Sequence, residues 1–265
     1  MFLSRRTFMC LTPAMAMVHG AAVRQSPSVP SDGKSLSPSF PSQDPDLARE
    51  MVAVSHNNAA RVRELLGNWP TLANASWDWG YGDWESALGA ASHVGNREIA
   101  GLLLAAGARP TIFSAAMLGQ LDVVKAFVTT SPGIQKTRGP HGLTLLSHAR
   151  AGGAGAAEVV AYLESIGGAD PRYSNEPMAD SDRAAIIGTY AFGPAATEQL
   201  TVKATDRGLS IERAGRPARG LLHLGQRAFH PVGADKVRIR FAPGNPSASV
   251  TIEDGPVLVT AKRVA

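Results

Sequence analysis

One sequence phrase recurs through the first two-thirds of the chain: a polar start, apolar residues at helical spacing and a closing glycine. Its clearest copy is residues 95–110, GNREIAGLLLAAGARP, and related copies occupy 60–66, 119–128 and 157–171. The apolar residues at helical spacing in the clearest copy are Ile99, Leu102, Leu103 and Ala106. A single copy cannot bury its apolar face alone, so this self-similarity restricts this part of the chain to an array of stacked helices.

A shorter, alanine-rich segment precedes two of these copies. Residues 86–95 read SALGAASHVG and residues 112–119 read IFSAAMLG. Gly95, Gly107 and Gly119 provide the left-handed position at which helices commonly end. The repeated unit is therefore predicted to be a helix, a tight turn, a second helix and a loop.

The segment 86–109 resembles the ankyrin repeat, whose phrase runs T-P-L-H-x-A-A-x-x-G-x-x-E-[IV]-V-x-x-L-L-x-x-G-A-D. Residues 143–149 follow the phrase more loosely. The departures in the first segment are Ser86, Ala87, Gly89 and Arg109, which stand where the family has Thr, Pro, His and Asp. The resemblance covers about residues 46–171 in four irregularly spaced units. It implies a curved helical solenoid whose concave face binds other proteins.

The hydrophobic period changes after Pro171. Short segments rich in β-formers follow one another, with turn signals at 206–208 (DRG) and 253–255 (EDG). They predict a small antiparallel β-barrel or sandwich over 186–265. This part resembles the small accessory domain at the C-termini of secreted penicillin-binding-protein-like hydrolases. The residues that carry the likeness are Gly188, Tyr190, Phe229, Val237, Phe241, Ala261, Lys262 and Arg263. The predicted fold class is thus multidomain, an ankyrin-repeat solenoid followed by a small β domain.

The N-terminus resembles a twin-arginine export signal, carried by Arg5, Arg6 and Phe8. Its apolar stretch is too short and broken to span a membrane, so no stable membrane insertion is expected after the signal is removed. A Pro- and Ser-rich linker follows. The predicted segments are a signal peptide at 1–24, this linker at 25–45, repeats at 46–171, a second linker at 172–185 and the β domain at 186–265. The predicted location is the periplasm.

Aromatic residues gather in residues 74–87, NASWDWGYGDWESA. This stretch falls where an ankyrin array carries a projecting hairpin. Alternation places Trp77, Trp79 and Tyr81 on one face of an extended segment, and Trp79 and Tyr81 are expected to be exposed. A purely architectural role for the group is the alternative. The candidate partner-binding residues are Trp77, Asp78, Trp79, Tyr81, Asp83, Trp84, His93, Arg138 and His141.

Charge and motifs exclude several function classes. A formal charge of +4, without a basic run interleaved with aromatics, argues against nucleic-acid binding. No nucleophile elbow, phosphate-binding loop or dinucleotide fingerprint occurs, so no enzyme activity and no cofactor are expected. No H-E-x-x-H or H-x-H motif occurs, so no metal site is expected, and His148 is expected to pack or hydrogen-bond. The predicted function is protein–protein interaction with an unidentified partner, and the alternative is binding of a small ligand or glycan.

Overall fold

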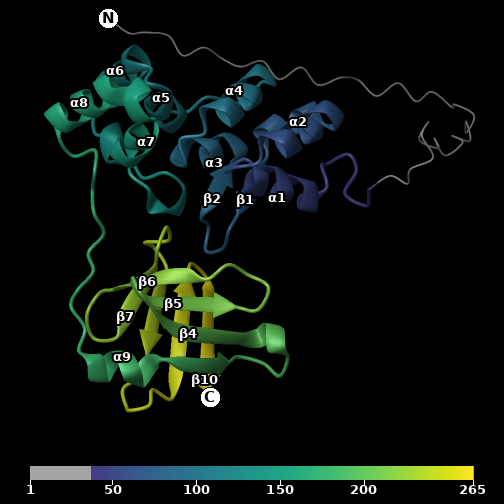
Figure 1. Cartoon of the computed structure of the whole chain (residues 1–265). Coiled ribbons are helices and arrows are strands. Elements are labelled where there is room, and N and C mark those ends of the chain that lie inside the picture. The colour runs from purple at the N-terminus through teal and green to yellow at the C-terminus, as the bar shows by residue number, and fades with distance from the viewer. Residues whose placement is uncertain (1–36, 265) are drawn as a thin grey trace, which may run out of the picture.

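Helices fill the N-terminal half of the chain and strands the C-terminal half in the computed structural model, which describes residues 37–264 (Figure 1). The predicted signal peptide, with Arg5, Arg6 and Phe8, and most of the first linker lie outside the described residues. Within the described part of the chain, no helix has the length and apolar character needed to cross a bilayer.

Eight helices of the described N-terminal half follow one another as short pairs. They are α1 Pro45–Val54, α2 Ala59–Asn68, α3 Ala87–His93, α4 Arg97–Ala105, α5 Ile112–Leu118, α6 Leu121–Thr130, α7 Leu145–Ala151 and α8 Ala157–Ile166. Polar caps start several of them: the Asn96 side chain accepts a hydrogen bond from the backbone of Ile99 in α4, for example. At Gly119 the chain turns with φ 76°, and a Cβ there would lie 1.9 Å from the Gly155 carbonyl oxygen, so only glycine fits.

The predicted fold class is wrong, because these helices are not arranged as a solenoid. Their buried apolar residues form two separate clusters, one mainly from α1–α4 and one from α5–α8. Only one two-stranded hairpin, β1 Ser76–Asp78 with β2 Trp84–Ser86, projects from the described helical half. The other connections include short 3-10 turns, among them η1 Pro70–Asn74, η2 Ile134–Lys136, η3 Pro140–Gly142 and η4 Gly153–Ala156. The physical reason is the irregular spacing of the units, which prevents identical stacking from one unit to the next.

The C-terminal half is a closed barrel of eight antiparallel strands and forms a large part of the fold rather than a small appendage. Its order around the barrel is β10-β3-β4-β5-β6-β7-β8-β9. The strands are β3 Gly188–Ala191, β4 Gln199–Thr205, β5 Gly208–Arg213, β6 Arg219–His223, β7 Ala228–Pro231, β8 Arg238–Phe241, β9 Ser249–Asp254 and β10 Val257–Arg263. Tyr190, Phe229 and Phe241 pack edge-to-face in its core, and α9 Asp180–Ile186 contributes Ile186 to the same core.

The β1–β2 hairpin reaches down from the helices to the open end of the barrel (Figure 1). Tyr81 at its tip has φ 61° and packs against the barrel core. Asp83, in the same hairpin, pairs with Arg219 of β6 at 2.6 Å. Gly233 of the barrel approaches so closely that a Cβ there would lie 3.1 Å from the Asp83 carboxylate. The hairpin therefore fixes the helical half onto the barrel.

Candidate metal centre

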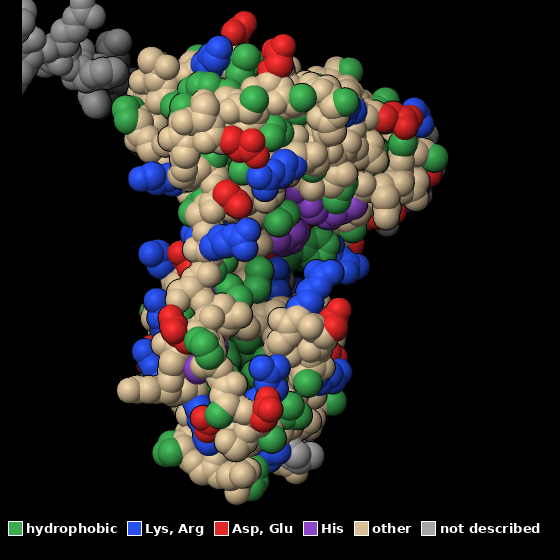
Figure 2. Space-filling model, turned by 60° about the vertical axis from the view of Figure 1, so that its left-hand side comes forward, with side chains coloured by type: hydrophobic (Ala, Val, Ile, Leu, Met, Phe, Trp, Pro, Cys, Tyr) green, Lys and Arg blue, Asp and Glu red, His purple; other side chains and the backbone are tan. Residues whose placement is uncertain are grey.

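Three histidines and one glutamate converge where the helical half meets the barrel. One ligand atom from each of His56, Glu85, His93 and His141 lies within 4.8 Å of the others. Figure 2 shows histidine side chains gathered in the recess between the two halves of the molecule. All four residues belong to the helical half and its hairpin, but they come from distant parts of the sequence.

Each side chain is positioned by a different element. His56 follows the C-terminal end of α1, and its Nδ1 lies 3.0 Å from the Ala53 carbonyl oxygen. Glu85 lies in β2 opposite Trp77 of β1, and His93 is the last residue of α3. His141 lies in η3 with a left-handed backbone, φ 58° and ψ 19°. Such a conformation at a non-glycine residue is uncommon and often marks a functional position.

The distances between the facing atoms suit a small cation. The Nε2 atoms of His56 and His93 are 3.1 Å apart, and His93 Nε2 lies 2.9 Å from Glu85 Oε1. His141 Nε2 lies 3.4 Å from Glu85 Oε1, and His56 Nε2 lies 3.6 Å from Glu85 Oε2. Ligand atoms of a tetrahedral zinc ion, at about 2.0–2.2 Å from the metal, are roughly 3.3 Å apart. These four contacts are near that spacing, and the ligand atoms of all four residues lie within 4.8 Å of one another, close enough to converge on one ion.

Glu85 supplies a buried acceptor that faces the histidines. Its side chain is fully buried. Its Oε2 accepts a hydrogen bond from the indole Nε1–H of Trp79 at 2.7 Å. Its Oε1 lies 2.9 Å from His93 Nε2 and 3.4 Å from His141 Nε2, but neither contact has good hydrogen-bond geometry. A buried carboxylate oxygen without a donor is costly unless a cation satisfies it.

Asp83 orients His141 in the manner common around protein-bound metals. His141 Nδ1 lies 2.7 Å from Asp83 Oδ2, and the His141 backbone N–H donates to Asp83 Oδ1 at 2.8 Å. With Nδ1 held by a carboxylate, Nε2 is the ring nitrogen left to bind a metal. This carboxylate–histidine arrangement fixes the ring and raises its basicity as a ligand.

The local charges explain the protonation states of these groups. Burial alone would raise the pKa of Glu85, but the neighbouring His141 and His93 outweigh it and hold that pKa at about 2. Burial would lower the pKa of His141, but Asp83 and Glu85 beside it raise that pKa to about 9. The centre without metal therefore carries a proton on His141 at neutral pH, and a metal ion would displace it.

His148 lies next to this centre without joining it. Its ring centroid is 6.4 Å from that of His93, and burial lowers its pKa to about 4. Its Nδ1 lies 2.9 Å from the Thr144 carbonyl oxygen, which confirms the predicted packing and hydrogen-bonding role.

The structure places the sequence-predicted residues in unequal roles. His93 and His141 are potential ligands, while Asp83 and Trp79 hold two of the four ligands in place. Trp79 and Tyr81 are only partly exposed, contrary to expectation, because Trp79 packs on the helical core and Tyr81 on the barrel core. The remaining predicted residues lie outside the centre. Trp77 packs on the helical core, and Asp78 lines a cavity at the barrel mouth. Trp84 is 63% exposed, and Arg138 stacks on Tyr173.

The expectation of no metal site does not fit this cluster, and His56 and Glu85 were missed altogether. Metal motifs such as H-E-x-x-H hold ligands close together in sequence, whereas these four come from the turn after α1 and from β2, α3 and η3. The only local signal was His93 near the end of a predicted inner helix. Comparisons of the chain with protein-family models, curated proteins and solved structures found no match.

Proposed function

We propose that this protein binds one divalent transition-metal ion, with zinc as the best fit, through His56, Glu85, His93 and His141. The observation that carries the proposal is the convergence of three imidazole nitrogens on the buried Oε1 and Oε2 of Glu85, with one ligand atom of each residue within 4.8 Å of the others. Imidazole and carboxylate ligands suit zinc, and the absence of thiolates argues against a soft-metal site. Calcium and magnesium prefer oxygen ligands and fit this set poorly.

Four protein ligands complete a tetrahedral shell, which is typical of structural rather than catalytic zinc. The ion would join the end of α1, the hairpin, α3 and η3, beside the apolar cluster in which α1, α3 and Trp79 of the hairpin already pack. The hairpin in turn contacts the barrel through Tyr81 and Asp83. The proposed role of the metal is thus to fix the junction between the two halves. The side chains of His56 and His141, 25% and 27% exposed, give the ion a route from solvent.

A zinc titration tests the proposal. The protein is stripped with a chelator, and zinc is added in competition with a chromogenic chelator. We expect one zinc per chain in the wild type and none held at comparable affinity by the His93→Ala, His141→Ala double variant. His230→Gln, a buried histidine of the barrel, is the matched control and retains zinc. Failure of the wild type to compete for zinc, or equal binding by the double variant, would refute the proposal.

A second candidate function remains from the sequence, namely binding of a protein or glycan by the hairpin. Trp84 favours it, because this indole is 63% exposed while the other hairpin aromatics are partly buried. A pull-down from cell-envelope extract, and a glycan array, would compare the wild type with Trp84→Ala. Specific capture that is lost in the variant supports this function, and identical capture by both removes Trp84 from it.

A further inference from the structure

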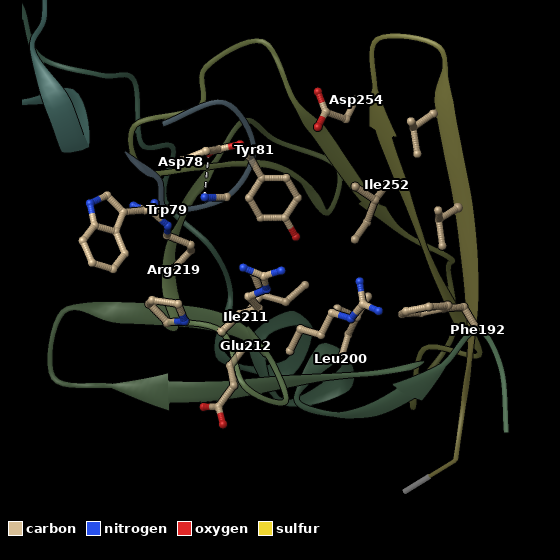
Figure 3. Close-up of a pocket in the computed structure, with 16 residues that line it drawn as sticks. Asp78, Trp79, Tyr81, Phe192, Leu200, Ile211, Glu212, Arg219, Ile252 and Asp254 are labelled. Carbon is tan, nitrogen blue, oxygen red and sulfur yellow. Dashed lines mark hydrogen bonds between the residues drawn. The ribbon is translucent and has the colours of Figure 1, made fainter. Parts of the chain in front are cut away.

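A cavity of about 360 Å³ opens at the barrel mouth, between the hairpin tip and strands of the barrel (Figure 3). Tyr81 points into it from the hairpin tip, and strands of the barrel form the opposite walls (Figure 3). The apolar side chains that line it include Phe192, Leu200, Ile211, Ile252, Val257 and Val259. Charged residues line it as well, namely Asp78, Glu212, Arg213, Arg216, Arg219 and Asp254. Apolar walls with convergent polar groups, in a cavity of this size, are typical of a small-molecule site.

Arg219 brings an unsatisfied charged group to this cavity. The residue is 9% exposed, and its Nη1 pairs with Asp83 at 2.6 Å. Its Nε and Nη2 are buried and have no hydrogen-bond partner among the described residues. These two N–H groups form one edge of the guanidinium, the edge that binds a carboxylate through two parallel hydrogen bonds.

The other charged groups around the cavity are of both signs. Asp78 accepts a hydrogen bond from the Gly80 backbone N–H, and Glu212 pairs with Lys203 at 3.0 Å. Asp254 also lines the wall and opposes an anion. Arg213 at the end of β5 and Arg216 in the β5–β6 turn also line it; Arg213 Nε donates to the Thr197 carbonyl oxygen at 2.6 Å, and neither arginine has an ion pair among the described residues. The hydrogen bond from Gly80 leaves the charge of Asp78 in place, so Asp78 and Asp254 balance the two arginines, and the Nε and Nη2 edge of Arg219 is what favours an anion.

We propose that this cavity binds a monocarboxylate with an apolar chain of medium length. The carboxylate would bind the Nε and Nη2 edge of Arg219, and the chain would lie against the aliphatic and aromatic walls. Tyr81 would donate a further hydrogen bond from its hydroxyl. The buried ion pair between Arg219 and Asp83 holds the guanidinium in place before the ligand arrives, which favours binding by preorganisation.

Calorimetric titration with octanoate tests the ligand class, with octylamine and octan-1-ol as controls of matched length. We expect saturable binding of one octanoate per chain, at least about tenfold tighter than either control, because a buried guanidinium rejects a cation and gains little from a hydroxyl. Absence of saturable octanoate binding, or equal binding of octylamine, would overturn the proposal.

Two variants locate the site. Arg219→Gln removes the charge, and Val259→Trp fills the cavity from a partly exposed wall position without altering the ion pair with Asp83. Each is expected to weaken octanoate binding at least about tenfold while an unchanged thermal transition shows that the barrel is folded. Arg240→Gln, which breaks an outer ion pair with Glu253 away from the cavity, is the matched control and binds as the wild type does. If Arg219→Gln disturbs the contact between the hairpin and the barrel, the Val259→Trp variant alone tests whether octanoate binds in this cavity. Octanoate binding unchanged by a folded Val259→Trp variant would contradict the proposal.

Discussion

His141 Nδ1 lies 2.7 Å from Asp83 Oδ2, and that same oxygen lies 2.6 Å from Arg219 Nη1. The chain of contacts runs from the candidate metal centre, through the hairpin, to the barrel. Burial alone would raise the pKa of Asp83, but the hydrogen bonds from His141 outweigh it and hold this pKa below its ordinary value. One buried carboxylate thus orients a potential metal ligand and also ties the two halves of the molecule together.

Replacing Asp83 with asparagine should weaken zinc binding by about 10- to 100-fold, because the amide orients His141 less firmly and raises its basicity less. Competition with a chromogenic chelator measures the change. Asp122→Asn, an exposed acid in the first turn of α6, removes the same charge far from the centre and should leave zinc affinity unchanged. Equal effects of the two substitutions would show that Asp83 acts only through overall charge.

Replacing Trp79 with phenylalanine keeps an aromatic ring but removes the N–H that donates to Glu85 Oε2. We expect zinc affinity to fall about tenfold or more, because Glu85 is no longer held in its ligating orientation. Trp77→Phe is the matched control, since Trp77 packs on the helical core and makes no side-chain hydrogen bond with the described residues. Unchanged zinc affinity in Trp79→Phe would exclude an orienting role for the indole.

The stability of the metal-free protein should depend on pH through His141 and Glu85. The pKa of His141 in the folded protein, about 9, lies above its ordinary value of 6.5. Protonated His141 therefore adds fully to the free energy of unfolding below pH 6.5, and this stabilisation is lost as the pH rises through 9. The pKa of Glu85 in the folded protein, about 2, lies below its ordinary value of 4.5. Ionised Glu85 therefore adds to the free energy of unfolding above pH 4.5, and this stabilisation is lost as the pH falls through 2. Stability from these groups is therefore greatest between pH 4.5 and 6.5.

Bound zinc should oppose the loss of stability between pH 6.5 and 9, because the metal binds His141 only without the proton on its ligating nitrogen. With chelator present, the free energy of unfolding should fall by on the order of 3 kcal/mol from pH 6.5 to 9. With zinc present, the stabilisation by the metal should grow over the same range. Denaturation at several pH values with chelator or zinc measures both, and parallel curves would contradict a metal centre that includes His141.

Gly233 should be required for the junction. Its φ is 83° and a Cβ there would meet the Asp83 carboxylate, whereas Gly225, with φ 91°, has open space around it. Alanine at either position strains the backbone by about 1 kcal/mol or more. Only Gly233→Ala should also lower zinc affinity, because only it displaces Asp83. Equal zinc affinity in the two variants would show that the contact between Gly233 and Asp83 does not influence the metal centre.

Local sequence signals located many helix ends and turns but not the arrangement of the helices. Capping by Asn96 and the left-handed glycines at 95, 107 and 119 are decided within a few residues, so sequence reading can find them. The packing of the units depends on how their faces fit, and the likeness to ankyrin repeats did not determine it. The helices form two apolar clusters instead of a solenoid.

The candidate site was only partly visible for a related reason. The sequence predicts partner-binding roles for His93, His141, Asp83 and Trp79, whereas the structure places them in contacts within one polar cluster. Glu85 gave no sequence signal, because a single glutamate in a short strand is ordinarily exposed. Its burial follows from the hairpin pairing and from the approach of η3, which are long-range contacts.

The most direct test of the metal centre is X-ray absorption spectroscopy at the zinc edge on protein loaded with one equivalent of zinc. Three imidazole nitrogens and one carboxylate oxygen at about 2.0–2.2 Å are predicted, with one imidazole fewer in His93→Ala. A zinc shell of mostly water oxygens, or a spectrum unchanged by His93→Ala, would contradict the assignment of His56, Glu85, His93 and His141 as a metal centre.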